Sequence, residues 1–492
     1  MAGGGLICVP SAAPSARRSW LRRALAISLA LVAAGCAAGP APPAPVARVE
    51  RVAAGAATLL DDLEQRTFRF FWERADPATG MVPDRWPTPS FSSVAAIGFG
   101  LTAYPIGVER GWVARADAAG RVATTLRFLW TAPQGPEPAG VAGHRGFYYH
   151  FLDAGSGRRF ETVELSSVDT ALLLGGVLFC EGYFDRDDPL EREIRELARQ
   201  IYERVDWAWM QPRPPLVSMG WTPEAGFHHL DWTGYSEAML VYVLALGSPT
   251  HPVAGAAWPA WASSYEVADF QGQHYLDFAP LFGHQYSHVW IDFRGIRDAA
   301  NRRLGFDYFE NSRRAVLAQR AWAIANPRGW RALGPDVWGV SACDGPADVE
   351  LPFGGEKRRF WTYAGRGLGP GFGVDDGTLA PTAAGGSVAF APDVALPALA
   401  EMKRRWGTWL YSEYGFLDAF NPSFDFPAVP VRHGRVVPGV GWFDTDYLGI
   451  DQGPILAMIE NHRSGLVWRV MRAHPAIRRG LERAGFAGGW LR

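Results

Sequence analysis

Three carboxylic acids crowd the sequence directly before an apolar run at 171–177. Ser166 and Asp169 fit the capping-box pattern, in which a hydroxyl residue is followed three positions later by an acid at the start of a helix. Asp169 therefore has a structural interpretation beside a catalytic one. Glu164 lies before the proposed cap, where neither the capping box nor the helix interior accounts for it, so it is the stronger catalytic candidate. Glu161 is either a further acid of the same site or a solvated surface residue.

A second candidate acid, Glu237, lies at the start of another apolar run at 238–246. Thr233 fits the cap of this helix, and the helix dipole favours an acid in the first turn, which gives Glu237 a purely structural interpretation. Aromatic residues nonetheless precede it closely. So many aromatic side chains near one acid indicate a sugar-binding subsite, formed by Trp221, Phe227, Trp232 and Tyr235.

A third acid, Asp451, stands in the segment 449–454, where Pro454 near a first helical position indicates a further helix start. Asp451 is then a cap, an anchor for the turn, or a site residue. All three segments open helices with apolar interiors. If these helices run in the same direction inside a ring, Glu164, Glu237 and Asp451 meet at one end. Such a group suits cleavage of a glycosidic bond, which needs a protonated acid for the leaving oxygen and a carboxylate that activates water or attacks carbon.

Other chemistries have weaker support. His284 and His288 are one helical turn apart and could hold a metal ion, but no glutamate follows the first histidine as in the zincin pattern. We therefore predict neither a metal nor a cofactor, and we place His288 and Trp290 among the sugar-binding candidates. The sequence contains no nucleophile elbow, phosphate-binding loop or dinucleotide fingerprint in the strand–turn–helix setting that each requires.

Helical patterns dominate the elements that must position these residues. Amphipathic segments at 59–71 and 194–205 alternate with runs that are apolar on all sides, at 94–104, 171–179 and 238–246. A helix that is apolar all round must be covered by neighbours, whereas an amphipathic helix has one solvated face. The alternation therefore predicts an all-α fold with an inner and an outer ring of helices, an (α/α) toroid.

The composition excludes one class of partner. A formal net charge of −2 gives no basic excess, so we do not expect nucleic acid as a partner. With 48% hydrophobic residues, the chain can form a substantial core. The 21 tryptophans are more than an average soluble protein carries, and they favour flat surfaces of the kind that bind sugar rings.

The first 35 residues are typical of a lipoprotein signal peptide. Arginines at 17–23 precede a short apolar run, and small residues lead to Cys36 in a pattern that resembles a lipobox. The pattern predicts export, with a lipid anchor at Cys36 in the outer membrane or periplasm of a Gram-negative bacterium; an ordinary cleaved signal is the alternative. Residues 36–55 would be a tether rich in alanine and proline, and 56–492 one catalytic domain. Whether Cys180 and Cys343 pair is not decided by their spacing.

Residues 56 to about 486 resemble the bacterial glucoamylase-like proteins of glycoside hydrolase family 144. The motifs that carry the resemblance are FYYHFL at 147–152, ELSSVDT at 164–170, YSEAM at 235–239, LALGSPTHP at 244–252 and GIDQGP at 449–454. The resemblance implies an (α/α)6 toroid with long loops over the active-site end, and the glycine- and proline-rich segments 354–374 and 421–441 would be such loops.

The same resemblance implies hydrolysis of β-1,2-glucan or a related β-glucan by a pair of carboxylic acids, with inversion at the anomeric carbon. It also implies pocket roles for Glu164, for Glu237 and for an acid just before Glu164, which here would be Glu161. Two alternatives keep most of these features. A non-catalytic surface lipoprotein that binds glycans needs the tryptophans and no acid pair, and a transglycosylase on the same scaffold would differ in its products.

Overall fold

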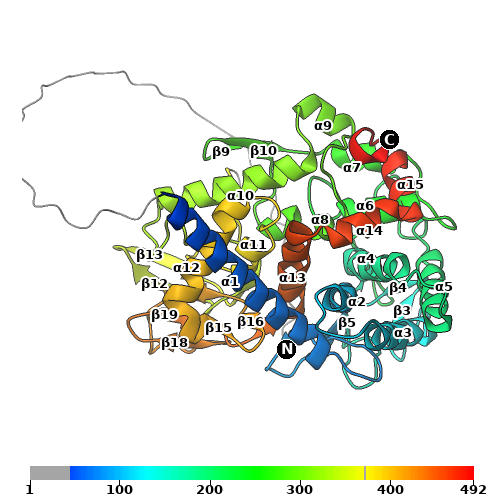
Figure 1. The fold of residues 1–492 in the computed structure, drawn as a ribbon, viewed down its shortest axis with the longest axis horizontal. Helices are drawn as coiled ribbons and strands as arrows, with labels where there is room; N and C mark the ends of the chain where they lie inside the picture. Colours follow the sequence, from blue (N-terminus) through cyan, green and yellow to red (C-terminus); the bar gives the residue numbers. More distant parts are fainter. Residues whose placement is uncertain (1–44, 371–372) are drawn as a thin grey trace, which may run out of the picture. The chain divides into compact units, whose positions relative to one another are not determined.

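The computed structural model describes residues 45–370 and 373–492, and the chain divides into two units, residues 1–57 and 58–492 (Figure 1). The predicted signal peptide at 1–35 and Cys36 lie outside the described residues. No helix in the described part of the chain is long and apolar enough to cross a membrane. All the candidate site residues other than Cys36 belong to the second unit.

The runs predicted to be apolar on all sides form helices that are buried along most of their length. They are α2 (Val94–Glu109), α4 (Ser167–Tyr183) and α6 (Met239–Gly247). The predicted amphipathic segments lie in α1 (Pro45–Arg74) and α5 (Pro189–Glu203), whose apolar stripes face the core with Leu63 and Ile194 fully buried. The alternation of the two kinds of helix is therefore confirmed.

Glycine allows the buried helices to pack closely. Helices α2 and α4 touch where Gly98 faces Gly176, and a Cβ built on Gly176 would lie 2.0 Å from the carbonyl oxygen of Gly98. That distance is a severe overlap, so any side chain at position 176 would force the two helices apart. Helix α4 in turn packs against α6.

Three further helices continue the buried series. In α8 (Tyr286–Trp290), the Ser287 hydroxyl accepts the N–H of Leu240 in α6 at 3.1 Å. Gln285, just before α8, donates to the Ala383 carbonyl of α11 (Pro381–Gly385) at 2.9 Å. Thr382 of α11 lies against the start of α13 (Gly449–Arg463). Because α13 also packs against α2, the series returns to its beginning.

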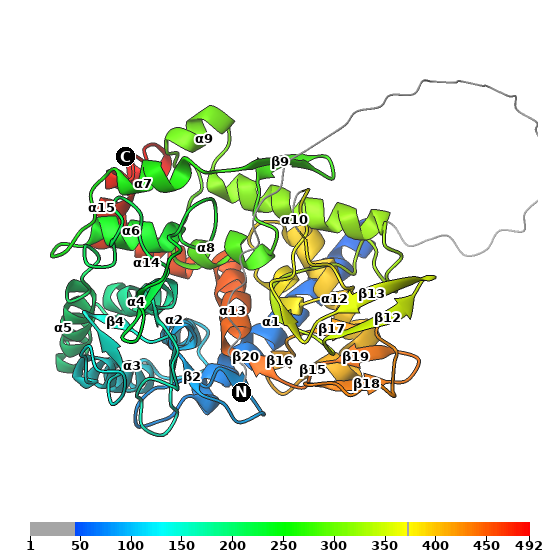
Figure 2. The same cartoon turned by 180° about the vertical axis from the view of Figure 1, so that it is seen from behind.

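Amphipathic helices cover this series. Helix α3 (Arg115–Thr131) packs against α2 and α5, and α12 (Pro392–Leu410) packs against α11. Figure 1 shows α13 near the middle of the ribbon with α2 on one side and α12 on the other, and Figure 2 shows the same order from behind. The remaining helices are α7 (Ala257–Ala262), α9 (Ala299–Leu304), α10 (Tyr308–Ala325), α14 (Leu466–Ala473) and α15 (Pro475–Arg483), with 3-10 turns at Leu281–His284 and Gly489–Leu491.

Short antiparallel strands join the helices, so the fold is mostly helical rather than purely α. The strands of the first half of the chain form three pairs and one sheet. The pairs are β1 (Arg85–Trp86) with the distant β20 (Tyr447–Leu448), β2 (Ser92–Ser93) with β5 (Phe151–Leu152), and β3 (Gly143–His144) with β4 (Phe147–Tyr148). The sheet consists of β6 (Leu165–Ser166), β7 (Gly220–Thr222) and β8 (Gly226–Phe227).

The rest are β9 (Val267–Phe270) with β10 (Gln273–Leu276), β11 (Cys343–Asp344) with β14 (Tyr363–Ala364), β12 (Val349–Phe353) with β13 (Glu356–Phe360), β15 (Tyr411–Ser412) with β16 (Gly415–Phe416), and the sheet of β17 (Phe420–Asn421), β19 (Gly441–Phe443) and β18 (Arg435–Val437). Several of these strands fall wholly or partly in the segments 354–374 and 421–441, which we predicted as loops. Cys180 and Cys343 are both buried as free thiols, so they do not form a disulfide.

Candidate active site

The segment that carries Glu164 is held by a strand and a helix cap. Leu165 and Ser166 of β6 pair with β7, and Ser166 then caps α4. The Ser166 hydroxyl accepts the N–H of Asp169 at 3.2 Å and donates to the Asp169 carboxylate at 2.5 Å. The predicted cap at Ser166 is therefore present, with the Asp169 carboxylate bonded to the Ser166 hydroxyl in place of the Ser166 backbone N–H of a standard capping box. It fixes Asp169 in the first turn of α4 and leaves the other carboxylate oxygen, Oδ1, to face His150 at 3.6 Å.

His150 joins the two acids of this segment. Its Nδ1 lies 2.9 Å from Oε1 of Glu164. Burial lowers the pKa of His150, but the fields of Asp169 and Glu164 outweigh burial and raise that pKa to about 9. His150 is therefore an imidazolium at neutral pH. Burial also opposes ionisation of Glu164, yet the hydrogen bond and charge of His150 hold the pKa of Glu164 below its ordinary value. Glu164 is the ionised acid of the group.

Glu237 has the opposite environment. Only 8% of the residue is exposed, and its Oε2 has no hydrogen-bond partner in the described part of the structure. Burial, reinforced by the charge of Asp169, raises the pKa of Glu237 to about 7. The Glu237 side chain is therefore protonated in a large fraction of the molecules at neutral pH. The helix cap that we predicted at Thr233 is wrong, because α6 begins only at Met239 and Glu237 precedes it.

Asp451 lies inside the first turn of α13, because the helix begins at Gly449 and not after Asp451 as predicted. Asp451 is 4% exposed, and its carboxyl group contacts that of Asp418. Burial raises the pKa of Asp451 to about 7; the hydrogen bond with Asp418 opposes the rise, and the charges of Asp344 and Asp84 add to it.

One hydroxyl group faces acids from all three segments. Burial, and then the fields of Asp451, Glu237 and Asp169 among others, raise the pKa of Tyr286 well above its ordinary value. The Tyr286 hydroxyl also donates to the carbonyl oxygen of Ile450 at 3.3 Å, beside Asp451. Asp169, Glu237 and Asp451, which lie at the starts of α4, α6 and α13, therefore share one electrostatic environment.

Half-buried aromatic side chains gather on the sheet of β6, β7 and β8, which begins directly after Glu164. Trp221 pairs with Leu165 across β6 and β7 and with Phe227 across β7 and β8. The ring of Trp209 completes the group, 5.5 Å from Trp221 and 4.8 Å from Phe227. The Glu164 side chain lies on the face of this sheet to which Gly220 points, since a Cβ on Gly220 would lie 3.2 Å from Glu164 Cγ. Successive residues of a strand point to opposite faces, so Trp221 and Phe227 lie on the other face. A half-buried aromatic surface of this kind suits the apolar face of a sugar ring.

The Glycoamylase family model, described as "Putative glucoamylase", matches residues 229–475, half of the chain, and includes Glu237 and Asp451. The protein belongs to the Glycoamylase family. An exo-β-1,2-glucooligosaccharide sophorohydrolase (non-reducing end) of Parabacteroides distasonis is 27% identical over 461 residues, which cover 86% of this chain and 57% of that protein. This Glycoamylase-family chain thus spans little more than half the length of the curated relative it matches.

Solved structures support the family relationship over a longer range. An endo-β-1,2-glucanase from Chitinophaga pinensis, in complex with sophorotriose and glucose, has a TM-score of 0.75 at 26% identity and covers 88% of this chain and 99% of that chain. An endo-β-1,2-glucanase from Talaromyces funiculosus with sophorose has a TM-score of 0.61 at 14% identity, covers 88% of this chain and 90% of that chain, and shows a shared fold alone.

Three predicted sugar-binding residues of this Glycoamylase-family protein are in the core instead. The indole N–H of Trp290 donates to Thr102 at 3.0 Å, and the ring is fully buried. His288 is also fully buried, with Nε2 3.2 Å from the Ser312 hydroxyl. Tyr235 is 3% exposed and reaches the same hydroxyl at 3.3 Å. Each ring packs inside the helical core, so the sugar-binding roles predicted for these three residues stay predictions without structural support.

The other predicted residues differ in how accessible they are. Trp221 and Phe227 are half-buried and can contact a ligand. Trp232 is 9% exposed and donates to the Ser167 hydroxyl at 2.9 Å, so it supports the start of α4. Glu161 is exposed, in a turn with φ of 47°, which agrees with the solvated alternative. A catalytic role for Glu161 stays a prediction without structural support.

Sequence reasoning did not assign His150, Tyr286 or Asp84 to the site. His150 stands in the FYYHFL motif, which was a signal for it. Tyr286 stands between His284 and His288, which drew attention only as possible metal ligands, and Asp84 belongs to a short connection, so no local pattern assigns either residue to the acids. Oxygen atoms of Asp344, Asp418 and Asp444 lie close enough together to hold a metal ion, in a group that the sequence analysis also did not find.

Proposed function

We propose that this protein hydrolyses β-1,2-glucan or its oligosaccharides, with Glu237 as the general acid. The observation that carries the proposal is the opposite ionisation of two acids that each interact with Asp169, because the pKa of Glu237 is raised to about 7 while that of Glu164 is lowered. A protonated carboxyl can give its proton to the leaving glycosidic oxygen, and a carboxylate can accept a proton from water. The β-1,2 linkage is supported by the names of the Parabacteroides and Chitinophaga relatives.

Two acids are candidates for activating the water molecule. Glu164 comes first because the His150 imidazolium keeps it ionised. Asp451 comes second because it shares the field at Tyr286 with Glu237. We propose an inverting reaction, in which the acid and the base act from opposite faces of the sugar ring with a water molecule between base and carbon.

We also propose that the fold is an (α/α)6 toroid. The support is the closed series of six buried helices, α2, α4, α6, α8, α11 and α13, with amphipathic helices outside it. In such a ring the helix starts that carry Glu164, Glu237 and Asp451 lie at one end. We further propose that Cys36 is lipidated after removal of residues 1–35 and anchors the catalytic domain to the outer membrane or holds it in the periplasm.

Product analysis on linear β-1,2-, β-1,3-, β-1,4- and α-1,4-glucans tests the activity. We expect new reducing ends from β-1,2-glucan, and we expect Glu237→Gln to lower kcat by about 10²- to 10⁴-fold while the circular dichroism spectrum stays unchanged. A ladder of long products would indicate endo cleavage, and one short sugar would indicate exo cleavage.

Binding of glycan without any new reducing end would refute hydrolysis and favour a binding lipoprotein. Products longer than the substrate would favour a transglycosylase. Equal rates for wild type and Glu237→Gln would refute the role of Glu237. Proton NMR of the first product resolves inversion from retention, because the two outcomes release opposite anomers.

A further inference from the structure

A group of buried aspartates lies where three strands end. Asp344 ends β11, Asp418 precedes β17, and Asp444 follows β19. One carboxylate oxygen from each residue lies within 4.8 Å of the other two, and all three residues are at most 3% exposed. We call these residues the aspartate trio.

Backbone N–H groups donate to one carboxylate oxygen of Asp418 and one of Asp444, and they leave the other oxygen of each without a backbone donor. Asp418 Oδ2 accepts the backbone N–H of Asp344 at 2.8 Å, while its Oδ1 has no donor in the described structure apart from the carboxyl group of Asp451, which contacts Asp418. Asp444 Oδ1 accepts the backbone N–H groups of Thr445 at 2.6 Å and Asp446 at 3.2 Å, while its Oδ2 has no donor among the described residues. A buried acceptor without a donor is costly, so these two oxygens need a partner.

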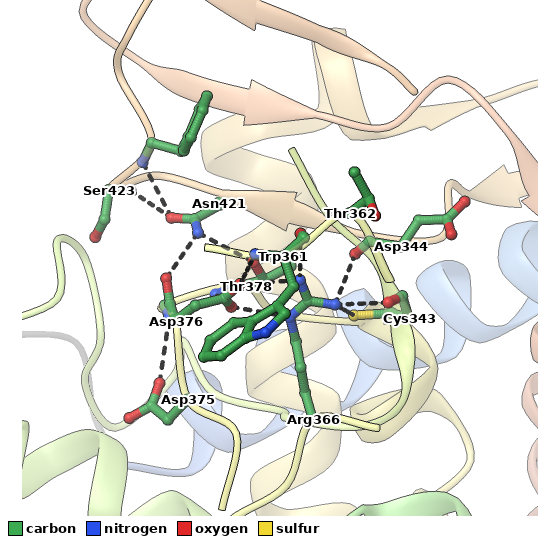
Figure 3. A network of polar contacts seen from close by, with 12 residues as sticks. Cys343, Asp344, Trp361, Thr362, Arg366, Asp375, Asp376, Thr378, Asn421 and Ser423 are labelled. Atoms are coloured by element: carbon green, nitrogen blue, oxygen red, sulfur yellow. Dashed lines mark hydrogen bonds and ion pairs between the residues drawn. The ribbon is translucent and has the colours of Figure 1, made fainter. Parts of the chain in front are cut away.

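The charges around the trio do not balance. The Arg85 guanidinium reaches Asp344 at 2.7 Å, but it is also within 3.6 Å of Asp84 and of Asp446. A second buried guanidinium, Arg366, lies beside β11 as Figure 3 shows, and it donates to both oxygens of Asp376 at 2.9 Å. The Arg366 guanidinium donates to the backbone carbonyl oxygen of Asp344 and not to its carboxylate. Asp376 therefore uses the charge of Arg366, and Arg85 is the one guanidinium that reaches a carboxylate of the trio among the described residues. Because three ionised carboxylates would exceed this positive charge, burial and the neighbouring acids raise the pKa of Asp418 and of Asp444 well above the ordinary value.

We propose that Asp344, Asp418 and Asp444 bind one hard divalent cation, Ca²⁺ in the first place. Ca²⁺ takes carboxylate oxygens at about 2.3–2.6 Å, so ligands on opposite sides of the ion are about 5 Å apart and the oxygens of the trio fit around one ion. The ion would neutralise the buried charge and tie the three strand ends together. Asp451, whose carboxyl contacts Asp418, would lie directly beside this site.

Calcium binding by the full-length protein tests the proposal. The protein is treated with EDTA, desalted, and titrated with CaCl₂ at neutral pH by calorimetry and by thermal unfolding, with NaCl at equal ionic strength as the reference. We expect one Ca²⁺ per chain and a saturable rise of several degrees in Tm. Asp444→Asn should weaken Ca²⁺ binding by more than about tenfold, because the number of charged ligands sets the affinity.

The variant separates binding from folding. In Asp444→Asn the amide oxygen would still accept the two backbone N–H groups that Oδ1 of Asp444 accepts, so in EDTA this variant should be at least as stable as wild type. Asp298→Asn is the matched control: Asp298 is 1% exposed, accepts the indole N–H of Trp258 and belongs to another part of the core. The control variant should keep the wild-type Ca²⁺ affinity.

Three results would overturn the proposal. One is the absence of a calcium-specific heat and of a Tm shift, which would mean that shared protons alone satisfy the trio. Another is an equal Tm rise with NaCl, which would mean ionic screening. The third is an equal loss of affinity in Asp298→Asn and Asp444→Asn. No glucan is present in these measurements, so their outcome does not depend on the proposed hydrolysis.

Discussion

Replacing Glu237 by glutamine should make the protein more stable at pH 8 while it removes activity. In the unfolded chain a glutamate ionises near its ordinary pKa of 4.5, whereas burial raises the pKa of Glu237 in the folded protein to about 7. That difference corresponds to about 3 kcal/mol of free energy of unfolding. The contribution of Glu237 is most favourable below pH 4.5, declines as pH rises toward 7, and reaches its lowest value above pH 7. Glutamine does not titrate and avoids this loss.

Thermal unfolding of wild type and Glu237→Gln at pH 5 and pH 8 measures the effect. With an entropy of unfolding near 2.1 cal/mol/K per residue, about 3 kcal/mol corresponds to about 3–4 °C in Tm for a folded unit spanning residues 58–492. We expect the variant to melt higher than wild type by nearly this amount at pH 8, and by much less at pH 5.

Glu164→Gln is the control of opposite sign. The pKa of Glu164 is lowered in the folded protein, so its charge adds stability above its ordinary pKa, and the glutamine variant should melt lower than wild type at pH 8. If Glu237→Gln melted lower than wild type by the same amount at both pH values, Glu237 would not be a buried protonated acid, and its assignment as the general acid would fail.

Two further predictions concern the rest of the site. His150→Gln should shift the acidic limb of the pH profile of kcat/KM to higher pH, because Glu164 loses the imidazolium that lowers its pKa; an unchanged limb would mean that Glu164 does not need to be ionised. Trp221→Ala should raise KM by about 2- to 10-fold with kcat nearly unchanged, since a stacked ring contributes about 0.5–1.5 kcal/mol to binding. Equal losses in kcat and in kcat/KM would instead place Trp221 in contact with the transition state. Steady-state kinetics on β-1,2-glucan measure both.

The helices and the acids could be predicted because their signals are local. An apolar run after Ser166 and Asp169 specifies both a buried helix and the cap that starts it, and the structure confirms both. The accessibility of aromatic residues could not be predicted in the same way. Trp221 and Trp290 both stand near candidate site residues, yet one lies on a sheet beside Glu164 and the other inside the core. Packing between distant segments decides which of the two has a free face.

The same limit explains the residues that were missed. Asp84 reaches the site because Gly449 donates to its carbonyl oxygen at 2.9 Å, across most of the chain length. The aspartate trio is assembled from three strand ends, each too short to show a period of two. Pairings of this kind follow from tertiary contacts, and no window of the sequence contains both partners.

The pairing of β1 with β20 also constrains when the protein can become active during synthesis. Arg85 of β1 cannot pair until Leu448 of β20 has been synthesised, and Asp451 follows Leu448 by a few residues. The growing chain therefore lacks part of the proposed active site until almost all of it has been translated. Such late, long-range closure is slow relative to helix formation, and the exposed apolar faces of α2 and α4 would need protection in the interval. Any product that stops before position 447 should consequently be inert and prone to aggregate.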